Sequence, residues 1–128
     1  METKSLKIAI IGAGNMGGAI ARGLSRGTLV ENNSIFVSDI SQKNLNDLKR
    51  FAPEITVSTS NIEIIENADI IILAVKPWLI KSVAQEIERK IDYKKQMIVS
   101  IAAGINFEQL AEYFNTDATL FRIIPNTA

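Results

Sequence analysis

The apolar residues of this sequence gather in short unbroken blocks rather than in alternating patterns. The blocks follow one another along the whole chain, at residues 8–11, 35–37, 70–75, 97–99 and 120–124, and a weaker candidate covers residues 56–59. Continuous apolarity is expected where helices cover both faces of a parallel sheet, whereas a one-sided antiparallel sheet alternates apolar and polar residues. The blocks therefore predict the strands of a buried parallel sheet.

Stretches long enough for helices separate these blocks and cover residues 16–26, 42–51, 62–67, 78–89 and 107–114. In the fourth stretch, Ile80, Val83 and Ile87 recur with the period of a helix and form one apolar stripe. Strand and helix therefore alternate along the chain. This alternation predicts an α/β fold, a doubly wound parallel sheet with right-handed crossovers, built as a single domain over residues 1–128.

Several residues mark where the helices should begin. Ser41 and Asn106 each precede a helical stretch, and Asn61 precedes the shortest one, so all three are predicted N-caps. Pro77 stands where a strand must pass into a helix. Trp78 follows it, and we expect this only tryptophan to be partly buried on the helix that it begins.

The composition excludes several kinds of chemistry. The chain has neither cysteine nor histidine, so it has no Cys/His zinc site, no thiol nucleophile and no imidazole acid or base, and we expect no metal site. Its 14 basic residues balance its 14 acidic ones, which argues against nucleic acid and anionic membranes as partners. The longest purely apolar run covers only residues 70–75, whereas a membrane span needs about twenty residues, so a cytoplasmic location is the default expectation.

Three glycines form a G-x-G-x-x-G pattern between the first block and the first helical stretch. Gly12 permits a tight turn, Gly14 lets the backbone approach a pyrophosphate, and Gly17 lets the helix pack closely on the strand. The helix N-terminus would stabilise the phosphates through its free N–H groups and its partial positive charge. The pattern predicts the dinucleotide loop of a Rossmann-type fold. The alternative is a glycine turn that only serves packing, and no P-loop pattern is present.

Asp39 follows the second apolar block and lies about twenty residues beyond Gly17, the usual spacing for the acid that binds the adenosine ribose. An acid there favours NAD and repels the 2′-phosphate of NADP. Ser38, Ser41 and Lys43, however, could bind that phosphate, so the choice between NAD(H) and NADP(H) stays open. The alternative for Asp39 is a residue that only starts the turn before Ser41.

The carboxyl ends of the other strands should carry function as well, because ligands of open parallel sheets bind there. The fourth strand ends at residues 74–77, where Lys76 offers a cation, and small residues at 102–104 follow the fifth. The alternative is ordinary turn chemistry. Asn61 is either a plain N-cap or a cofactor contact. We predict no catalytic residue, which fits a domain whose nicotinamide cofactor carries the chemistry.

Four blocks of the sequence, taken together, resemble the N-terminal domain of pyrroline-5-carboxylate reductase. In this order and spacing they are I-G-A-G-N-M-G at 11–17, A-V-K-P at 74–77, S-I-A-A-G at 100–104 and R-I-I-P-N-T at 122–127. The resemblance covers essentially the whole chain. It implies the reduction of 1-pyrroline-5-carboxylate to L-proline by NADPH, or sometimes NADH, in the cytoplasm.

Residues at matching positions are expected to bind the cofactor. The resemblance assigns the pyrophosphate, ribose and nicotinamide contacts to Ile11, Gly12, Ala13, Gly14, Asn15, Met16, Gly17, Ser38, Asp39, Asn61, Ala74, Val75, Lys76, Pro77, Ala102, Ala103 and Gly104. Asn126 and Thr127 would lie at a domain junction. Asp39 departs from the family, whose members often have an uncharged residue there, and Ala128 stands where proline is usual.

The family continues beyond this point into a helical domain that dimerises and supplies most of the imino-acid pocket. We therefore expect this chain to bind cofactor without turning over substrate, whereas full-length members are homo-oligomers. Two alternatives stay open. One is a different reductase of the same broad superfamily, acting on a 3-hydroxy acid or linked to a deazaflavin. The other is a dinucleotide-binding module without catalysis.

Overall fold

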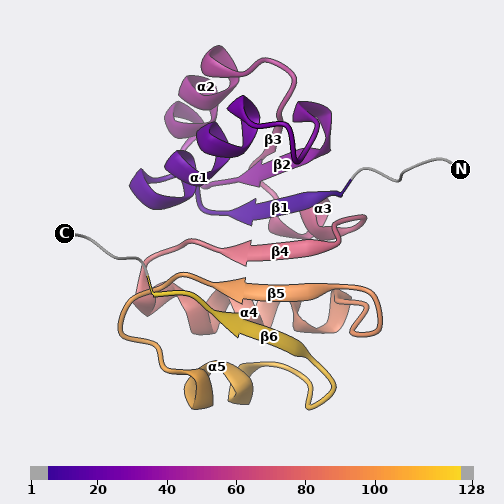
Figure 1. Cartoon of the computed structure of the whole chain (residues 1–128). Helices are drawn as coiled ribbons and strands as arrows, with labels where there is room; N and C mark the ends of the chain where they lie inside the picture. The colour runs from indigo at the N-terminus through magenta and orange to yellow at the C-terminus, as the bar shows by residue number, and fades with distance from the viewer. Residues whose placement is uncertain (1–5, 125–128) are drawn as a thin grey trace, which may run out of the picture.

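The computed structural model describes residues 6–124 and contains one parallel sheet of six strands. The strands are β1 (Ile8–Ile11), β2 (Ile35–Ser38), β3 (Thr56–Ser58), β4 (Ile70–Leu73), β5 (Met97–Ser100) and β6 (Thr119–Arg122), in the spatial order β3-β2-β1-β4-β5-β6. Their arrowheads all point to one side in Figure 1. The predicted doubly wound parallel sheet is confirmed.

Helices connect the strands and cover both faces of the sheet. They are α1 (Asn15–Arg26), α2 (Gln42–Phe51), α3 (Asn61–Ile65), α4 (Ile80–Ile87) and α5 (Phe107–Tyr113). In Figure 1, α1 and α2 lie beside β2 and β3, whereas α4 and α5 lie beside β5 and β6. Two separate apolar clusters result, one between the sheet and α1 and α2, the other between the sheet and α3, α4 and α5.

The central strand β1 shows why its apolar block is unbroken. All four of its residues are buried, and they alternate between the two clusters: Ile8 and Ile10 pack toward α1 and α2, and Ala9 and Ile11 pack toward the opposite helices. A strand covered on both faces has no side chain that reaches water, so a polar residue at any of these positions would lose its hydration.

Several predicted boundaries were wrong at the strand ends. The strand predicted over residues 70–75 ends at Leu73, and the one predicted over 120–124 is shifted to Thr119–Arg122. The helix predicted over residues 78–89 is shorter, because single 3₁₀ turns at Pro77–Leu79 and Glu88–Lys90 flank α4. Trp78 lies on the first of these turns and is 75% exposed, so its predicted partial burial was also wrong.

The predicted helix caps are partly confirmed. The Ser41 side chain accepts a hydrogen bond from the N–H of Asn44, and Asn106 forms a capping box with Gln109. Asn61 is not the cap of α3. Ser60 takes that place, because its hydroxyl accepts from the N–H of Glu63, and this leaves the Asn61 side chain available for contacts elsewhere.

Candidate functional site

The strand order reverses at β1, which pairs with β2 on one side and with β4 on the other. Connections leave the carboxyl ends of β1 and β4 in opposite directions, so a crevice is expected there. A pocket of about 700 Å³ opens at this point. It is lined by fourteen of the predicted site residues: Ile11, Gly12, Gly14, Asn15, Met16, Ser38, Asp39, Asn61, Ala74, Val75, Lys76, Pro77, Ala102 and Ala103.

The glycines between β1 and the first turn of α1 differ in what a side chain at each position would meet. Gly12 has a φ of 110°, a conformation that side chains disfavour, and a Cβ there would lie 2.8 Å from the carbonyl oxygen of Ala74. Gly17 is buried, and a Cβ on it would collide with the carbonyl of Gly12 and touch the Cβ of Ala74 at 3.0 Å. The predicted roles of these two glycines in turning and packing the chain are confirmed.

Gly14 differs from both, because no steric clash within the described residues accounts for a glycine at this position. Within residues 6–124, a Cβ at this position would have no atom within 4 Å apart from its chain neighbours, and its φ of −71° suits any residue. Gly14 also lines the pocket and is the N-cap of α1. The open space beside Gly14 therefore fits a ligand that lies against the backbone here, as the pyrophosphate of a dinucleotide does.

The first turn of α1 is open to such a ligand. Side chains cap α2, α3 and α5, whereas within residues 6–124 no side chain caps α1 and no acid stands in its first turn. The first N–H groups of a helix lack partners inside the helix and attract an anion. A helix of 12 residues ending in Arg26 thus presents its positive end to the pocket.

Asp39 holds the loop as well as lining the pocket. Its Oδ2 accepts a hydrogen bond from the N–H of Ala13 at 2.7 Å, and its Oδ1 accepts from the N–H of Ser41 at 2.8 Å. The second bond closes the turn before Ser41, which is the alternative role predicted for this residue. The first joins β2 to the glycine loop across 26 residues of sequence and leaves the carboxylate at the pocket edge.

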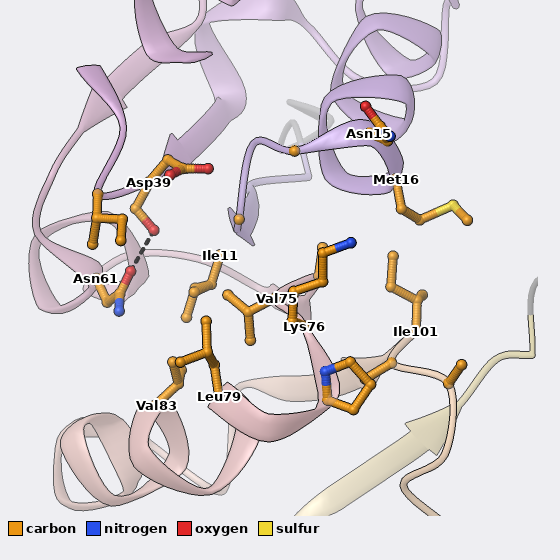
Figure 2. A pocket seen from close by; sticks show the side chains of 18 of the residues that line it. Ile11, Asn15, Met16, Asp39, Asn61, Val75, Lys76, Leu79, Val83 and Ile101 are labelled. Atoms are coloured by element: carbon orange, nitrogen blue, oxygen red, sulfur yellow. Dashed lines mark hydrogen bonds between the residues drawn. The ribbon is translucent and has the colours of Figure 1, made fainter. Parts of the chain in front are cut away.

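Asn61 links two elements at the same edge of the pocket. Its Oδ1 accepts from the hydroxyl of Ser38 at 2.6 Å, a bond drawn as a dashed line in Figure 2. Its Nδ2 donates to Oε1 of Glu86, on α4, at 2.8 Å. Since Ser60 caps the helix, the position of Asn61 is set by these two partners, and the side chain faces the cavity between them.

Three predicted residues do not line the pocket. Ala13 is buried behind the loop, Gly17 lies beneath Gly12, and Gly104 forms the turn after β5 with a φ of 82°. Each shapes a segment whose neighbours do line it. Asn126 and Thr127, predicted at a domain junction, lie outside the described residues.

Apolar side chains that the sequence analysis missed complete the pocket: Ile40, Leu79, Val83, Ile101 and Ile124, together with the polar Ser82. Leu79, at the end of the 3₁₀ turn before α4, and Val83, in α4, lie side by side in Figure 2. Their helical spacing was a usable signal. Ile40 is 93% exposed, and nothing in the local pattern distinguishes it from a core residue that follows a strand.

Within residues 6–124, no three aspartate or glutamate side chains come close enough to bind a metal ion. None of the helices in that range combines the length and the apolar character that a membrane crossing needs.

Comparisons with known proteins agree with this geometry. Residues 7–104 match the family model described as NADP oxidoreductase, coenzyme F420-dependent. A curated relative, pyrroline-5-carboxylate reductase 3 of Danio rerio, is 38% identical over 122 residues, which are 94% of this chain and 41% of the relative. This match confirms the resemblance seen in the four sequence blocks.

Solved structures give the same result. A pyrroline-5-carboxylate reductase from Coxiella burnetii superposes with a TM-score of 0.90 at 29% identity, over 97% of this chain and 45% of the other. A pyrroline carboxylate reductase of Plasmodium falciparum with NADP bound has a TM-score of 0.76 at 26% identity, over 91% and 41%. The chain thus spans less than half the length of each of these three relatives.

Proposed function

Because the chain belongs to the family described as NADP oxidoreductase, coenzyme F420-dependent, we propose that residues 1–128 form one domain that binds a nicotinamide dinucleotide, NADH or NADPH. The observation that carries this proposal is Gly14. Its missing side chain has no explanation within the described protein, and the space beside it opens into the pocket at the uncapped end of α1. A pyrophosphate supplies both the bulk and the negative charge that this place accepts.

The remaining residues of the pocket would each serve one part of the cofactor. Asp39 and Asn61 would hold the adenosine ribose, and the segments 74–77 and 102–103 would lie along the nicotinamide and its ribose. The reduced nicotinamide, when bound, supplies a hydride. The apolar side chains of Ile11, Val75 and Ile101 would keep water away from the cofactor.

We further propose that the reaction served is the reduction of 1-pyrroline-5-carboxylate to L-proline. The named relatives support this substrate, since they match nearly the whole chain. They are more than twice as long as the matched part, and we propose that the imino-acid pocket needs residues corresponding to the rest of their length. The cytoplasmic location and the homo-oligomeric state expected from the resemblance stay predictions.

A titration of the 128-residue chain with NADH and with NADPH, followed by nicotinamide fluorescence at fixed salt, tests the proposal. We expect saturable binding of at least one of the two. Addition of 1-pyrroline-5-carboxylate to the saturated chain should leave the nicotinamide absorbance unchanged. Failure of both cofactors to bind would refute the dinucleotide site, and proline formation by this chain alone would refute the need for further residues.

Lys76 provides a more specific prediction. Its side chain points toward the end of α1 that carries Asn15 and Met16 in Figure 2, and none of the ion pairs in the described part of the chain uses it. We expect Lys76→Met to weaken binding of the preferred dinucleotide about tenfold, or about 1.4 kcal/mol, because an ammonium near the phosphates is lost. The salt dependence of binding should also become shallower.

Lys81→Met is the matched control, since Lys81 is exposed on α4 and does not line this pocket. Equal effects of the two substitutions would mean that only the net charge of the chain matters and that Lys76 has no contact with the cofactor.

A further inference from the structure

The end of the pocket formed by β2 and β3 is built around a carboxylate that the fold keeps in place. Each oxygen of Asp39 accepts a backbone N–H, one from Ala13 and one from Ser41. An asparagine could satisfy only one of these donors, because its amide group would turn an N–H toward the other. In this chain, the two oxygens of an acid therefore satisfy both the glycine loop and the turn before α2.

Of the groups near Asp39 that could bind a phosphate, Ser38 and Lys43 already have partners, whereas the hydroxyl of Ser41 keeps its own proton to donate. The hydroxyl of Ser38 donates to Asn61, and the hydroxyl of Ser41 accepts the N–H that it caps on α2. Lys43 pairs with Asp47 at 2.9 Å on the outer face of α2, where the lysine side chain is 82% exposed. This hydrogen bond is also the main cause that lowers the pKa of the Asp47 carboxyl.

A second carboxylate approaches the same end of the pocket from α4. Glu86 accepts a hydrogen bond from Nδ2 of Asn61, and Oδ1 of Asn61 accepts one from the hydroxyl of Ser38. The N–H group of this amide is therefore directed at an acid. Among the pocket-lining residues within 6–124, Lys76, which follows β4, is the only cation. In Figure 2 its ammonium group points away from Asp39 and Asn61.

We infer that this chain selects NADH over NADPH and that Asp39 is the residue that determines the choice. The backbone occupies two of the roughly four lone-pair sites of its carboxylate, and Nδ2 of Asn44 donates to Oδ2 at 3.5 Å, which leaves an acceptor site on Oδ1 for the ribose 2′-hydroxyl of NADH. The 2′-phosphate of NADPH would instead face Asp39 and Glu86, while Lys43, the nearby cation on α2, is paired with Asp47. The inference rests on the proposed dinucleotide site and specifies its ligand. The Plasmodium falciparum relative, in contrast, was solved with NADP.

The test is a pair of equilibrium titrations, with NADH and with NADPH, on the unaltered chain and on Asp39→Ser. We expect the unaltered chain to bind NADH at least about tenfold more tightly than NADPH, and the preference to shrink as salt rises, because repulsion between charges is screened. Asp39→Ser should remove most of the preference. If Asp39 had a purely structural role, the substitution would weaken the binding of both cofactors equally and leave the ratio of their dissociation constants unchanged. That result would overturn the inference.

A second variant covers the case in which Asp39→Ser does not fold. Glu86 is exposed, and Glu86→Gln keeps an oxygen that can accept from Asn61 while it removes the charge. We expect this variant to shift the ratio of the two affinities about threefold toward NADPH, because a repulsion typical of an exposed charge is lost. Glu112→Gln, on α5 and away from the pocket, is the matched control.

The two proposals fail in different ways. Equal or tighter binding of NADPH by the unaltered chain would overturn the preference for NADH and leave the dinucleotide site intact. Absence of binding for both cofactors would overturn the site itself, and the preference with it.

Discussion

Gly17→Ala is expected to lower the free energy of unfolding of the chain by about 3 kcal/mol, the upper end of the range for overpacking a buried site. The added Cβ would collide with the carbonyl of Gly12 and press on the Cβ of Ala74. The first contact is with backbone, which cannot turn aside as a flexible side chain does. To relieve it, α1 must move away from β1, and the apolar contacts between them must loosen.

Urea unfolding followed by circular dichroism measures this effect, and Gly23→Ala is its matched control. Gly23 lies in the same helix and is exposed, and a Cβ there meets nothing within 4 Å. Alanine should therefore stabilise the helix at this position by about 0.5–1 kcal/mol. If both variants shifted the unfolding midpoint in the same direction, close packing at Gly17 would not be the reason for its glycine.

The parts of the fold that could be predicted depend on contacts close in sequence. The bounds of β1 and α2 follow from an unbroken apolar block and from a polar cap next to a periodic stretch, and the structure reproduces both. Gly12 and Gly17 could be assigned for a similar reason, because strand, turn and helix are consecutive and their close approach is repeated wherever this spacing occurs.

The parts that could not be predicted depend on partners far away in the sequence. Ser60 and Asn61 are both good caps, and the structure uses Ser60 because Asn61 is drawn to Ser38 and Glu86. Trp78 stands on a 3₁₀ turn whose direction is set by Pro77, so the indole reaches solvent instead of the sheet. The bond from Ala13 to Asp39 spans α1 and β2, and no local pattern contains it.

Asp39 also illustrates how one residue can satisfy two interpretations that looked like alternatives. The sequence offered either a ribose ligand or a turn-forming acid. The structure shows the turn, and the same two backbone bonds hold the carboxylate at the edge of the pocket. A residue that serves the fold in this way resists replacement by serine or asparagine, which ties the choice of cofactor to the stability of the loop.

Gly14→Asp is expected to separate binding from stability most clearly. Gly14 is the N-cap of α1, its φ of −71° is open to any residue, and a Cβ there meets no atom of the described residues within 4 Å apart from its chain neighbours. Aspartate is among the preferred N-caps, so the free energy of unfolding should rise by about 0.5 kcal/mol. The new carboxylate would accept the N–H groups of the first turn that we assign to the pyrophosphate and would repel its charge.

Loss of two hydrogen bonds to a charged group, about 1.5–3 kcal/mol each, predicts at least about a hundredfold weaker dinucleotide binding. Asn106→Asp is the matched control, because it places the same charge at the N-cap of α5, outside the pocket, and should leave binding unchanged. Urea unfolding and the fluorescence titration should therefore move in opposite directions for Gly14→Asp. A destabilised variant that still binds would show that Gly14 serves the backbone and that the phosphates lie elsewhere.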